Sequence, residues 1–229
     1  MYKTIFFDLD NTLWDTERNG KESMEEVYQD YGFDSLFPDF ETFYAIYWSN
    51  NLKLWDQYQI GEISKHKLIV ERLYFPLKPY MEYNEEFILS LNDDFLHRTS
   101  LRKKLIPDAI EILEYLKPKY KLYIISNGFT EVQHKKMKNS DLSRFFEGII
   151  LSDLVGVNKP HPEIFRKALE IASSKPEETI MIGDSWDADI VGAKNAKIDQ
   201  IWLNLNATQE GEFEPTFQIS SLKEIQNIL

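Results

Sequence analysis

Two aspartates near the N-terminus, separated by one residue, are the first side chains whose spacing could serve chemistry. Asp8 and Asp10 follow an apolar run from Ile5 to Phe7 and open a polar turn that includes Thr12. If extended geometry persists, both carboxylates leave the same side of the strand, because strand side chains alternate between faces. Like charges held so close repel each other and need a cation, a proton or a basic side chain between them. A hard divalent ion such as Mg²⁺ is the usual partner of clustered oxygen ligands, whereas a solvated acidic turn is the plainer interpretation of this run alone.

Three further polar clusters follow apolar runs later in the chain. They are Ser126-Asn127-Gly128, Lys159-Pro160, and Gly183-Asp184-Ser185 with Asp189 downstream. Each cluster is commonplace alone; a Ser-Asn-Gly sequence, for example, is a frequent turn. Together with the first aspartates they would provide a nucleophile, an acid, a hydroxyl and amide cradle, a lysine and a distal carboxylate. These are the parts that phosphoryl transfer requires.

The elements that must position these clusters alternate between two kinds. Short apolar runs bounded by turn residues predict buried strands over residues 3–8, 121–126, 148–152, 179–184 and 200–203. Helical patterns lie between and after them, over residues 107–116, 129–138, 162–171, 187–196 and 221–229, the last with Ser221 and Glu224 as a capping pair. This alternation predicts an α/β fold with a doubly wound, Rossmann-like parallel sheet. The carboxyl ends of parallel strands share one edge, so the four clusters would converge there.

More than a hundred residues separate the first predicted strand from the second, which is too long for a loop. The intervening segment is rich in aromatic residues, and Phe43, Tyr44, Tyr47 and Trp48 recur at helical spacing. We interpret residues 16–100 as an inserted, all-helical cap domain, with residues 1–15 and 101–229 forming the core. Helical spacing favours packing of these aromatic rings over contact with a nucleobase.

Composition narrows the function classes. The chain has 229 residues, no cysteine and a formal net charge of −12. Disulfides, thiolate metal sites and cysteine nucleophiles are excluded, and a nucleic acid polymer is not expected as a partner, because a basic surface is its usual footprint. No apolar run reaches the length of a membrane helix and no secretory leader pattern opens the chain, so we expect a cytoplasmic protein without a membrane partner. We expect it to act as a monomer or homodimer on a small-molecule phosphomonoester.

In their order and placement, the four clusters resemble those of the haloacid dehalogenase-like hydrolase superfamily, over nearly the whole chain. The helical insertion after the first cluster is similar to the helical-cap branch of that family. The resemblance implies that Asp8 is the nucleophile and forms an aspartyl-phosphate intermediate. It implies that Asp10 protonates the leaving alkoxide and then deprotonates the hydrolytic water. Lys159 would neutralise charge between the nucleophile and the phosphate.

The same resemblance implies a Mg²⁺ cofactor and assigns the remaining polar residues. The ion would be held by Asp8, the backbone carbonyl of Asp10, Asp184 and the phosphate. Ser126 and the Asn127 amide would bind phosphoryl oxygens. Asp189 would support the metal or Lys159 without contacting the substrate itself. Thr12 would also act from this outer layer of the site.

Finer features suggest a branch of the family. The dehalogenases lack an acid two residues after the nucleophile, so Asp10 favours a phosphatase, although mutases carry the same motifs. The five-residue step from Asp184 to Asp189 is similar to that of bacterial pyrimidine 5′-nucleotidases and acylneuraminate-9-phosphatases, and residues 54–61, 126–129 and 201–204 resemble the nucleotidases. Lys197 departs from the glycine that is more frequent after the fourth motif.

These features predict a phosphatase for pyrimidine nucleoside 5′-monophosphates. The alternatives are a sugar-phosphate or acylneuraminate-9-phosphate phosphatase with the same core chemistry, and a non-catalytic phospho-ligand-binding or regulatory protein on the same fold. Retention of Asp8, Asp10, Lys159 and Asp184 argues against the non-catalytic alternative.

Overall fold

The computed structural model describes residues 1–205 and 211–229. They form two compact units, one made of Met1–Thr16 and Lys103–Leu229, the other of Glu17–Arg102. The first unit contains the parallel sheet, and the second is helical. Within the described ranges, no helix combines the length and the apolar character needed to cross a membrane.

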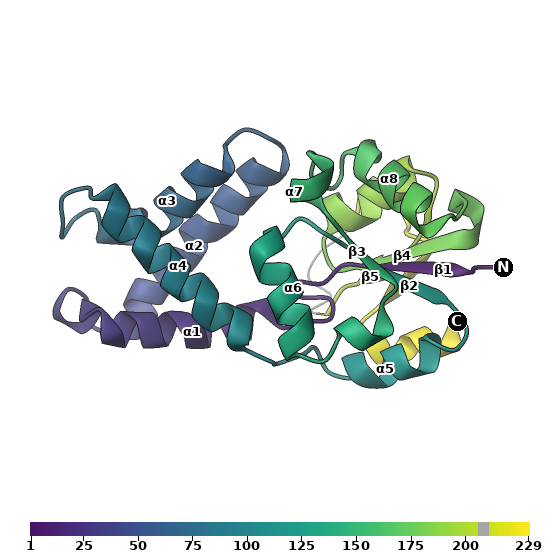
Figure 1. Cartoon of the computed structure of the whole chain (residues 1–229), viewed down its shortest axis with the longest axis horizontal. Helices are drawn as coiled ribbons and strands as arrows, with labels where there is room; N and C mark the ends of the chain where they lie inside the picture. Colours follow the sequence, from purple (N-terminus) through teal and green to yellow (C-terminus); the bar gives the residue numbers. More distant parts are fainter. Residues whose placement is uncertain (206–210) are drawn as a thin grey trace. The chain divides into compact units, whose positions relative to one another are not determined.

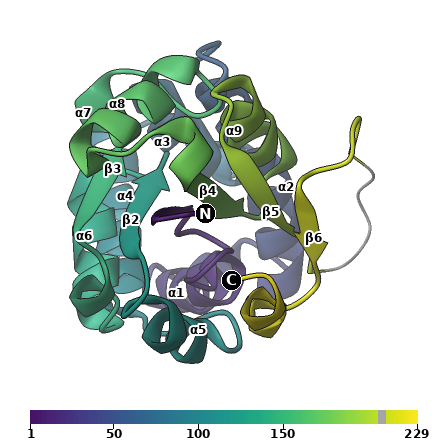
Figure 2. The ribbon, with the colours of Figure 1, turned by 90° about the vertical axis from the view of Figure 1, so that its right-hand side faces the viewer.

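The sheet of the first unit is entirely parallel, in the order β3-β2-β1-β4-β5-β6 (Figure 2). Its strands are β1 (Thr4–Phe7), β2 (Lys121–Ser126), β3 (Gly148–Leu151), β4 (Thr179–Gly183), β5 (Asp199–Leu203) and β6 (Phe217–Ile219). The prediction of a doubly wound, Rossmann-like sheet is confirmed. Strand β6 was not predicted, because three residues with a polar centre are too short to show a periodic pattern.

The connections of the first unit are mostly helical. They contain α5 (Ala109–Leu116), α6 (Thr130–Asn139), η2 (Ser143–Phe145), α7 (Ser152–Val155), α8 (Pro162–Ala172), η3 (Pro176–Glu178), η4 (Trp186–Val191), α9 (Gly192–Asn195) and η5 (Leu222–Asn227). The helix expected over residues 187–196 is instead the π-helix η4 followed by the short α9. The last helix is a 3₁₀ helix, and its predicted capping box between Ser221 and Glu224 is present.

Alternate residues of β1 belong to the cores on opposite faces of the sheet. Ile5 and Phe7 pack in a cluster with residues of α5 and η5, such as Leu222. Phe6 packs in a second cluster with Phe165 of α8. Figure 2 shows α5 and the C-terminal segment on one face and α7 and α8 on the other. Strand β1 is therefore buried on both faces, as its continuous apolar run predicted.

The second unit is built from α1 (Thr16–Asp30), η1 (Phe33–Ser35), α2 (Phe40–Gln59), α3 (Lys65–Leu77) and α4 (Glu85–Leu101), seen in Figure 1. Side chains cap three of these helices: Asp39 begins α2, Ser64 begins α3 and Asn84 begins α4. The aromatic rings of α2 form its core, since Phe43 and Tyr47 are almost fully buried. The preference for packing over base contact agrees with this burial.

Helix α9 ends in a Schellman turn with Lys197 in the left-handed conformation, at φ 60°. The Lys197 N–H donates to the Lys194 carbonyl at 2.9 Å, and the Ile198 N–H donates to the Ala193 carbonyl at 2.9 Å. Glycine adopts this conformation freely, whereas a side chain there costs on the order of 1–2 kcal/mol. The lysine at position 197, where the family more often has glycine, therefore affects the stability of the end of α9.

We predict that Lys197→Gly raises the free energy of unfolding by about 1 kcal/mol, because it relieves this left-handed strain. Urea denaturation would measure the gain as a higher midpoint at unchanged slope. The matched control is Lys135→Gly, an exposed position inside α6, which should lose about 1 kcal/mol. Equal losses in both variants would contradict the strain at Lys197.

Candidate active site

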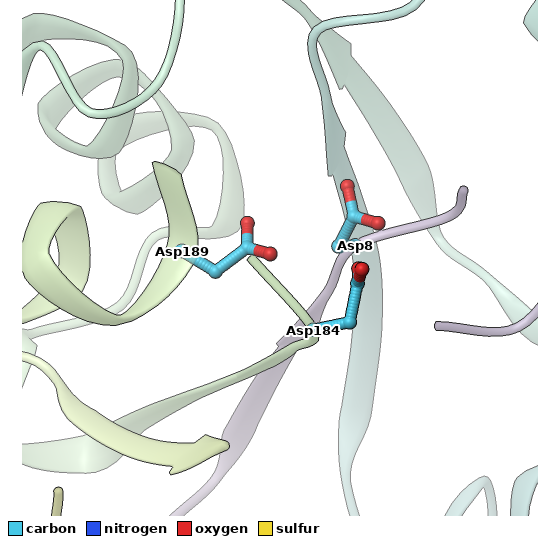
Figure 3. Close-up of side chains that lie close together, drawn as sticks. All are labelled: Asp8, Asp184 and Asp189. Carbon is cyan, nitrogen blue, oxygen red and sulfur yellow. The ribbon is translucent and has the colours of Figure 1, made fainter. Parts of the chain in front are cut away.

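The carboxyl edge of the sheet gathers the acidic residues of the first and fourth clusters. Phe7, the last residue of β1, pairs with Ile124 of β2 and Ile182 of β4. Asp8 follows β1 directly, and Asp184 follows β4. One carboxylate oxygen each of Asp8, Asp184 and Asp189 lies within 4.8 Å of the others. Figure 3 shows the three side chains converging from β1, the end of β4 and η4.

A buried lysine balances part of this charge. Lys159 Nζ donates to Asp8 Oδ1 at 2.6 Å, to Asp189 Oδ1 at 2.6 Å and to the Ile125 carbonyl at 2.8 Å. Its side chain is only 2% exposed. Burial alone would lower the pKa of Lys159, but the carboxylates of Asp189 and Asp8 outweigh that effect and raise it. Lys159 is therefore held as an ammonium group with all three protons donated.

The side chain of Asn127 positions that lysine through its main chain. Asn127 Oδ1 accepts from the Lys159 N–H at 2.8 Å, and Asn127 Nδ2 donates to the Lys159 carbonyl at 3.0 Å. Both ends of the carboxamide are thus engaged in holding the loop between α7 and α8. If Asn127 contacts phosphate, it would do so through its backbone N–H.

Asp184 and Asp189 are fixed by contacts of different kinds. Thr12 Oγ1 donates to Asp184 Oδ1 at 3.0 Å and accepts from the Asp184 N–H at 3.1 Å. Asp189 Oδ2 accepts from the Ser185 N–H at 3.1 Å, while its other oxygen accepts from the lysine. Gly183 makes room for this, because a Cβ there would lie 2.2 Å from Asp189 Oδ2. Asp189 thus acts as a holder of Lys159, and Asp184 is oriented by Thr12.

The donor set fits a divalent cation. Burial raises the pKa of Asp8 well above its usual value, Lys159 opposes that rise, and the carboxylates of Asp189, Asp184 and Asp10 add to it. Burial, together with the charge of Asp189, raises the pKa of Asp184 to about 7. Three carboxylates share one ammonium, so the cluster has an excess of negative charge that a hard cation would compensate. Asp8 and Asp184 are the residues that could hold such an ion.

Asp10 has a different environment. Its Oδ1 accepts from Lys136 Nζ at 2.6 Å and from Thr16 Oγ1 at 2.7 Å, and its Oδ2 accepts from Gln133 Nε2 at 2.6 Å. Burial raises the pKa of Asp10, but the charge of Lys136 and these hydrogen bonds outweigh burial and lower it. Lys136 also lies 4.2 Å from the centre of the Trp14 ring. This arrangement holds Asp10 as a carboxylate.

Lys136 and Gln133 were not predicted from the sequence. Both lie on α6, and both are buried among its apolar residues, beside Val132 and Met137. Polar side chains at positions of a predicted apolar stripe are the one signal that could have found them. Ser126, which was predicted, is also reached by Gln133: Ser126 Oγ accepts from Gln133 Nε2 at 2.7 Å and from the Gly128 N–H at 3.1 Å.

The chain thus combines a doubly wound parallel sheet with clustered carboxylates and a buried lysine at its carboxyl edge, where open α/β sheets bind their ligands. Residues 2–197 match the family model of the haloacid dehalogenase-like hydrolases, and the chain belongs to this family. The family resemblance of the four clusters is thereby confirmed.

Individual relatives align over nearly the whole chain. Pyrimidine 5′-nucleotidase YjjG of Escherichia coli is 30% identical, with 98% of this chain and 96% of that protein covered. A glyceraldehyde 3-phosphate phosphatase of Pyrococcus furiosus is 32% identical, over 93% of this chain and 85% of its own. Among solved structures, the HAD-hydrolase YfnB of Bacillus subtilis, described as bound to magnesium and as revealing interdomain movement, matches with a TM-score of 0.88 and 28% identity, covering 99% and 98% of the two chains. These relatives support phosphatase activity for this chain.

We predict that Mg²⁺ stabilises the protein by binding between Asp8 and Asp184. At a concentration one hundred times its dissociation constant, the ion should add about 2.7 kcal/mol to the free energy of unfolding. Thermal denaturation with and without Mg²⁺ measures this gain. Asp184→Asn should remove most of it, whereas Asp187→Asn, which changes an exposed neighbour, should keep it. A gain of the same size in both variants would place the ion elsewhere.

Mg²⁺ affinity should also depend on pH. Below pH 7 the metal-free protein carries a proton on Asp184, because the pKa of that carboxyl is raised to about 7. The ion must displace this proton, and the raised pKa of Asp8 acts in the same direction, so its affinity should fall by about tenfold or more between pH 8 and pH 6. Calorimetric titration in two buffers of different ionisation enthalpy would detect the released proton near pH 7. An affinity that stays constant over this range would contradict the raised pKa.

Proposed function

We propose that this protein is a Mg²⁺-dependent phosphomonoesterase that hydrolyses pyrimidine nucleoside 5′-monophosphates through an aspartyl-phosphate on Asp8. The observation that carries the proposal is the placement of Asp8 at the end of the central strand, paired with Lys159 and adjacent to Asp184. Full-length similarity to a pyrimidine 5′-nucleotidase supports the substrate class.

In the first half of the reaction, a carboxylate oxygen of Asp8 attacks phosphorus and the bond from phosphorus to the ester oxygen breaks. The departing alkoxide takes its proton from the carboxyl group of Asp10. The contacts of Asp10 in the structure favour its ionised form. A phosphate dianion bound nearby would raise the pKa of that carboxyl, toward the acid form that this step uses.

In the second half, the ionised Asp10 accepts a proton from water as that water attacks phosphorus. The bond from phosphorus to Asp8 breaks, inorganic phosphate forms and Asp10 regains the proton that it gave. The base form held by Lys136, Thr16 and Gln133 is suited to this step.

Electrostatic stabilisation falls to the groups around Asp8. A carboxylate attacks a phosphate dianion poorly, because both are negative, and the Lys159 ammonium supplies opposing charge beside the forming bond. Ser126 Oγ and the Asn127 N–H would bind phosphoryl oxygens. A bound Mg²⁺, held by Asp8, Asp184 and the Asp10 carbonyl, would add positive charge against those oxygens.

Asp10 favours ester hydrolysis over dehalogenation, because a halide leaves without a proton and an alkoxide requires one. Sugar phosphates, including acylneuraminate 9-phosphate, are the alternative substrate class. The similarity to a glyceraldehyde 3-phosphate phosphatase, at 32% identity, favours keeping small phosphorylated sugars in the comparison.

We predict Mg²⁺-dependent phosphate release that is selective for UMP, dUMP or dTMP within a panel of nucleotides and sugar phosphates. Asp8→Asn should lower turnover by about 10⁵-fold or more, since it removes the nucleophile, and should leave the circular dichroism spectrum unchanged. Preference for a sugar phosphate would keep the mechanism and discard the nucleotide substrate. Activity that persists in Asp8→Asn would overturn the mechanism.

A further inference from the structure

One side-chain amide lies between two groups of different function in this site. Gln133 Nε2 donates to Asp10 Oδ2 at 2.6 Å and to Ser126 Oγ at 2.7 Å. A single nitrogen therefore holds both the acid–base residue and the phosphate-binding hydroxyl. The three residues come from the loop after β1, the end of β2 and the buried face of α6.

The hydrogen-bond partners of this amide determine its orientation. In that orientation the nitrogen is bonded, whereas the oxygen Oε1 is not. An ionised carboxylate only accepts hydrogen bonds, so the nitrogen must face Asp10. Gln133 is fully buried, and its Oε1 has no hydrogen-bond partner within the described part of the chain. A buried acceptor without a donor is unfavourable for stability. The two donated hydrogen bonds, not packing, are what this residue contributes.

The same amide directs the hydroxyl of Ser126. Ser126 Oγ accepts from both Gln133 Nε2 and the Gly128 N–H, so the hydroxyl hydrogen is left to donate away from them. This arrangement requires a glycine at position 128, because a Cβ there would lie 2.2 Å from Gln133 Nε2. A hydroxyl held in this way is a preset donor for a phosphoryl oxygen.

We propose that Gln133 is a positioning residue that sets the spacing between the acid–base carboxyl of Asp10 and the phosphate-binding hydroxyl of Ser126. The inference rests on the proposed function, since it concerns the same phosphoryl transfer. It extends that function by coupling leaving-group protonation to phosphate binding through one amide. Loss of the amide should therefore harm esters that need a proton more than those that do not.

The test is the dependence of kcat/KM on the leaving group, which reports the first half of the reaction. In wild-type protein, kcat/KM should vary little from p-nitrophenyl phosphate through less acidic phenols to an alkyl phosphate. In Gln133→Met it should fall by about tenfold on p-nitrophenyl phosphate and by 10²-fold or more on the alkyl phosphate, because protonation by Asp10 is misaligned. The circular dichroism spectrum of Gln133→Met should match that of wild type, because removal of the unpaired Oε1 opposes the loss of the two donated hydrogen bonds.

Two variants serve as controls. Gln200→Met removes another buried glutamine amide of the same unit, one that donates to the Ile198 carbonyl, and should leave the leaving-group dependence flat. Gln133→Leu also removes the donor, with an apolar side chain of a different shape, and should show the same steep dependence as Gln133→Met.

Each outcome decides a separate question. An equal loss on every ester in Gln133→Met would overturn the positioning role and leave the proposed function standing. A wild type that hydrolyses aryl phosphates but no pyrimidine nucleotide would remove the substrate assignment while the steep dependence still supports Gln133. A wild type without Asp8-dependent hydrolysis of any ester would overturn both.

Discussion

The carboxylate cluster depends on the buried ammonium group of Lys159. Lys159 bonds Asp8, Asp189 and a carbonyl of β2 at once, and almost none of it reaches solvent. Without it the clustered carboxylates would lie buried and uncompensated, at a cost of several kcal/mol per ion. The lysine comes from the loop between α7 and α8, and its carboxylate partners come from the residue after β1 and from η4. One ammonium group, through two ion pairs and a hydrogen bond to a carbonyl, therefore both permits the charge cluster and ties three separate segments to one edge of the sheet.

Two glycines contribute to the site through the side chains they lack. Gly183 lies against Asp189, and Gly128 lies against Gln133; a Cβ at either position would collide with the polar group above it. Neither glycine adopts a left-handed conformation in the structure. Their contribution is the close approach of a buried polar side chain to the backbone at a strand end. Glycine is therefore needed at these two positions for the close packing of a polar side chain, and not for a turn conformation.

Much of this could be predicted from the sequence, since the apolar runs of the five longer strands and the polar residues after them are local signals. Long-range pairing is not local. Lys136 donates to Asp10 across 126 positions of sequence. A lysine on the buried face of a helix interrupts the amphipathic pattern without indicating which residue it contacts. The Asn127 amide was expected at the phosphate, and the contact of the Asn127 side chain with the main chain of Lys159 is a long-range pairing that local patterns do not predict. Residues 187–196 were predicted as one helix, and their division into the π-helix η4 and the short α9 is a backbone detail that residue propensities do not encode.

The central position of β1 has a consequence for the order in which the chain can fold. Thr4 pairs with Lys121 on one side and with Thr179 on the other, so neither neighbour exists when the first strand is synthesised. At a translation rate of about 5–20 residues per second, the strand that precedes Asp8 waits on the order of ten seconds or longer for its second partner. The helical unit of Glu17–Arg102 has its whole sequence available during that interval. During biosynthesis the apolar residues of β1 therefore remain without their strand partners and need protection from aggregation.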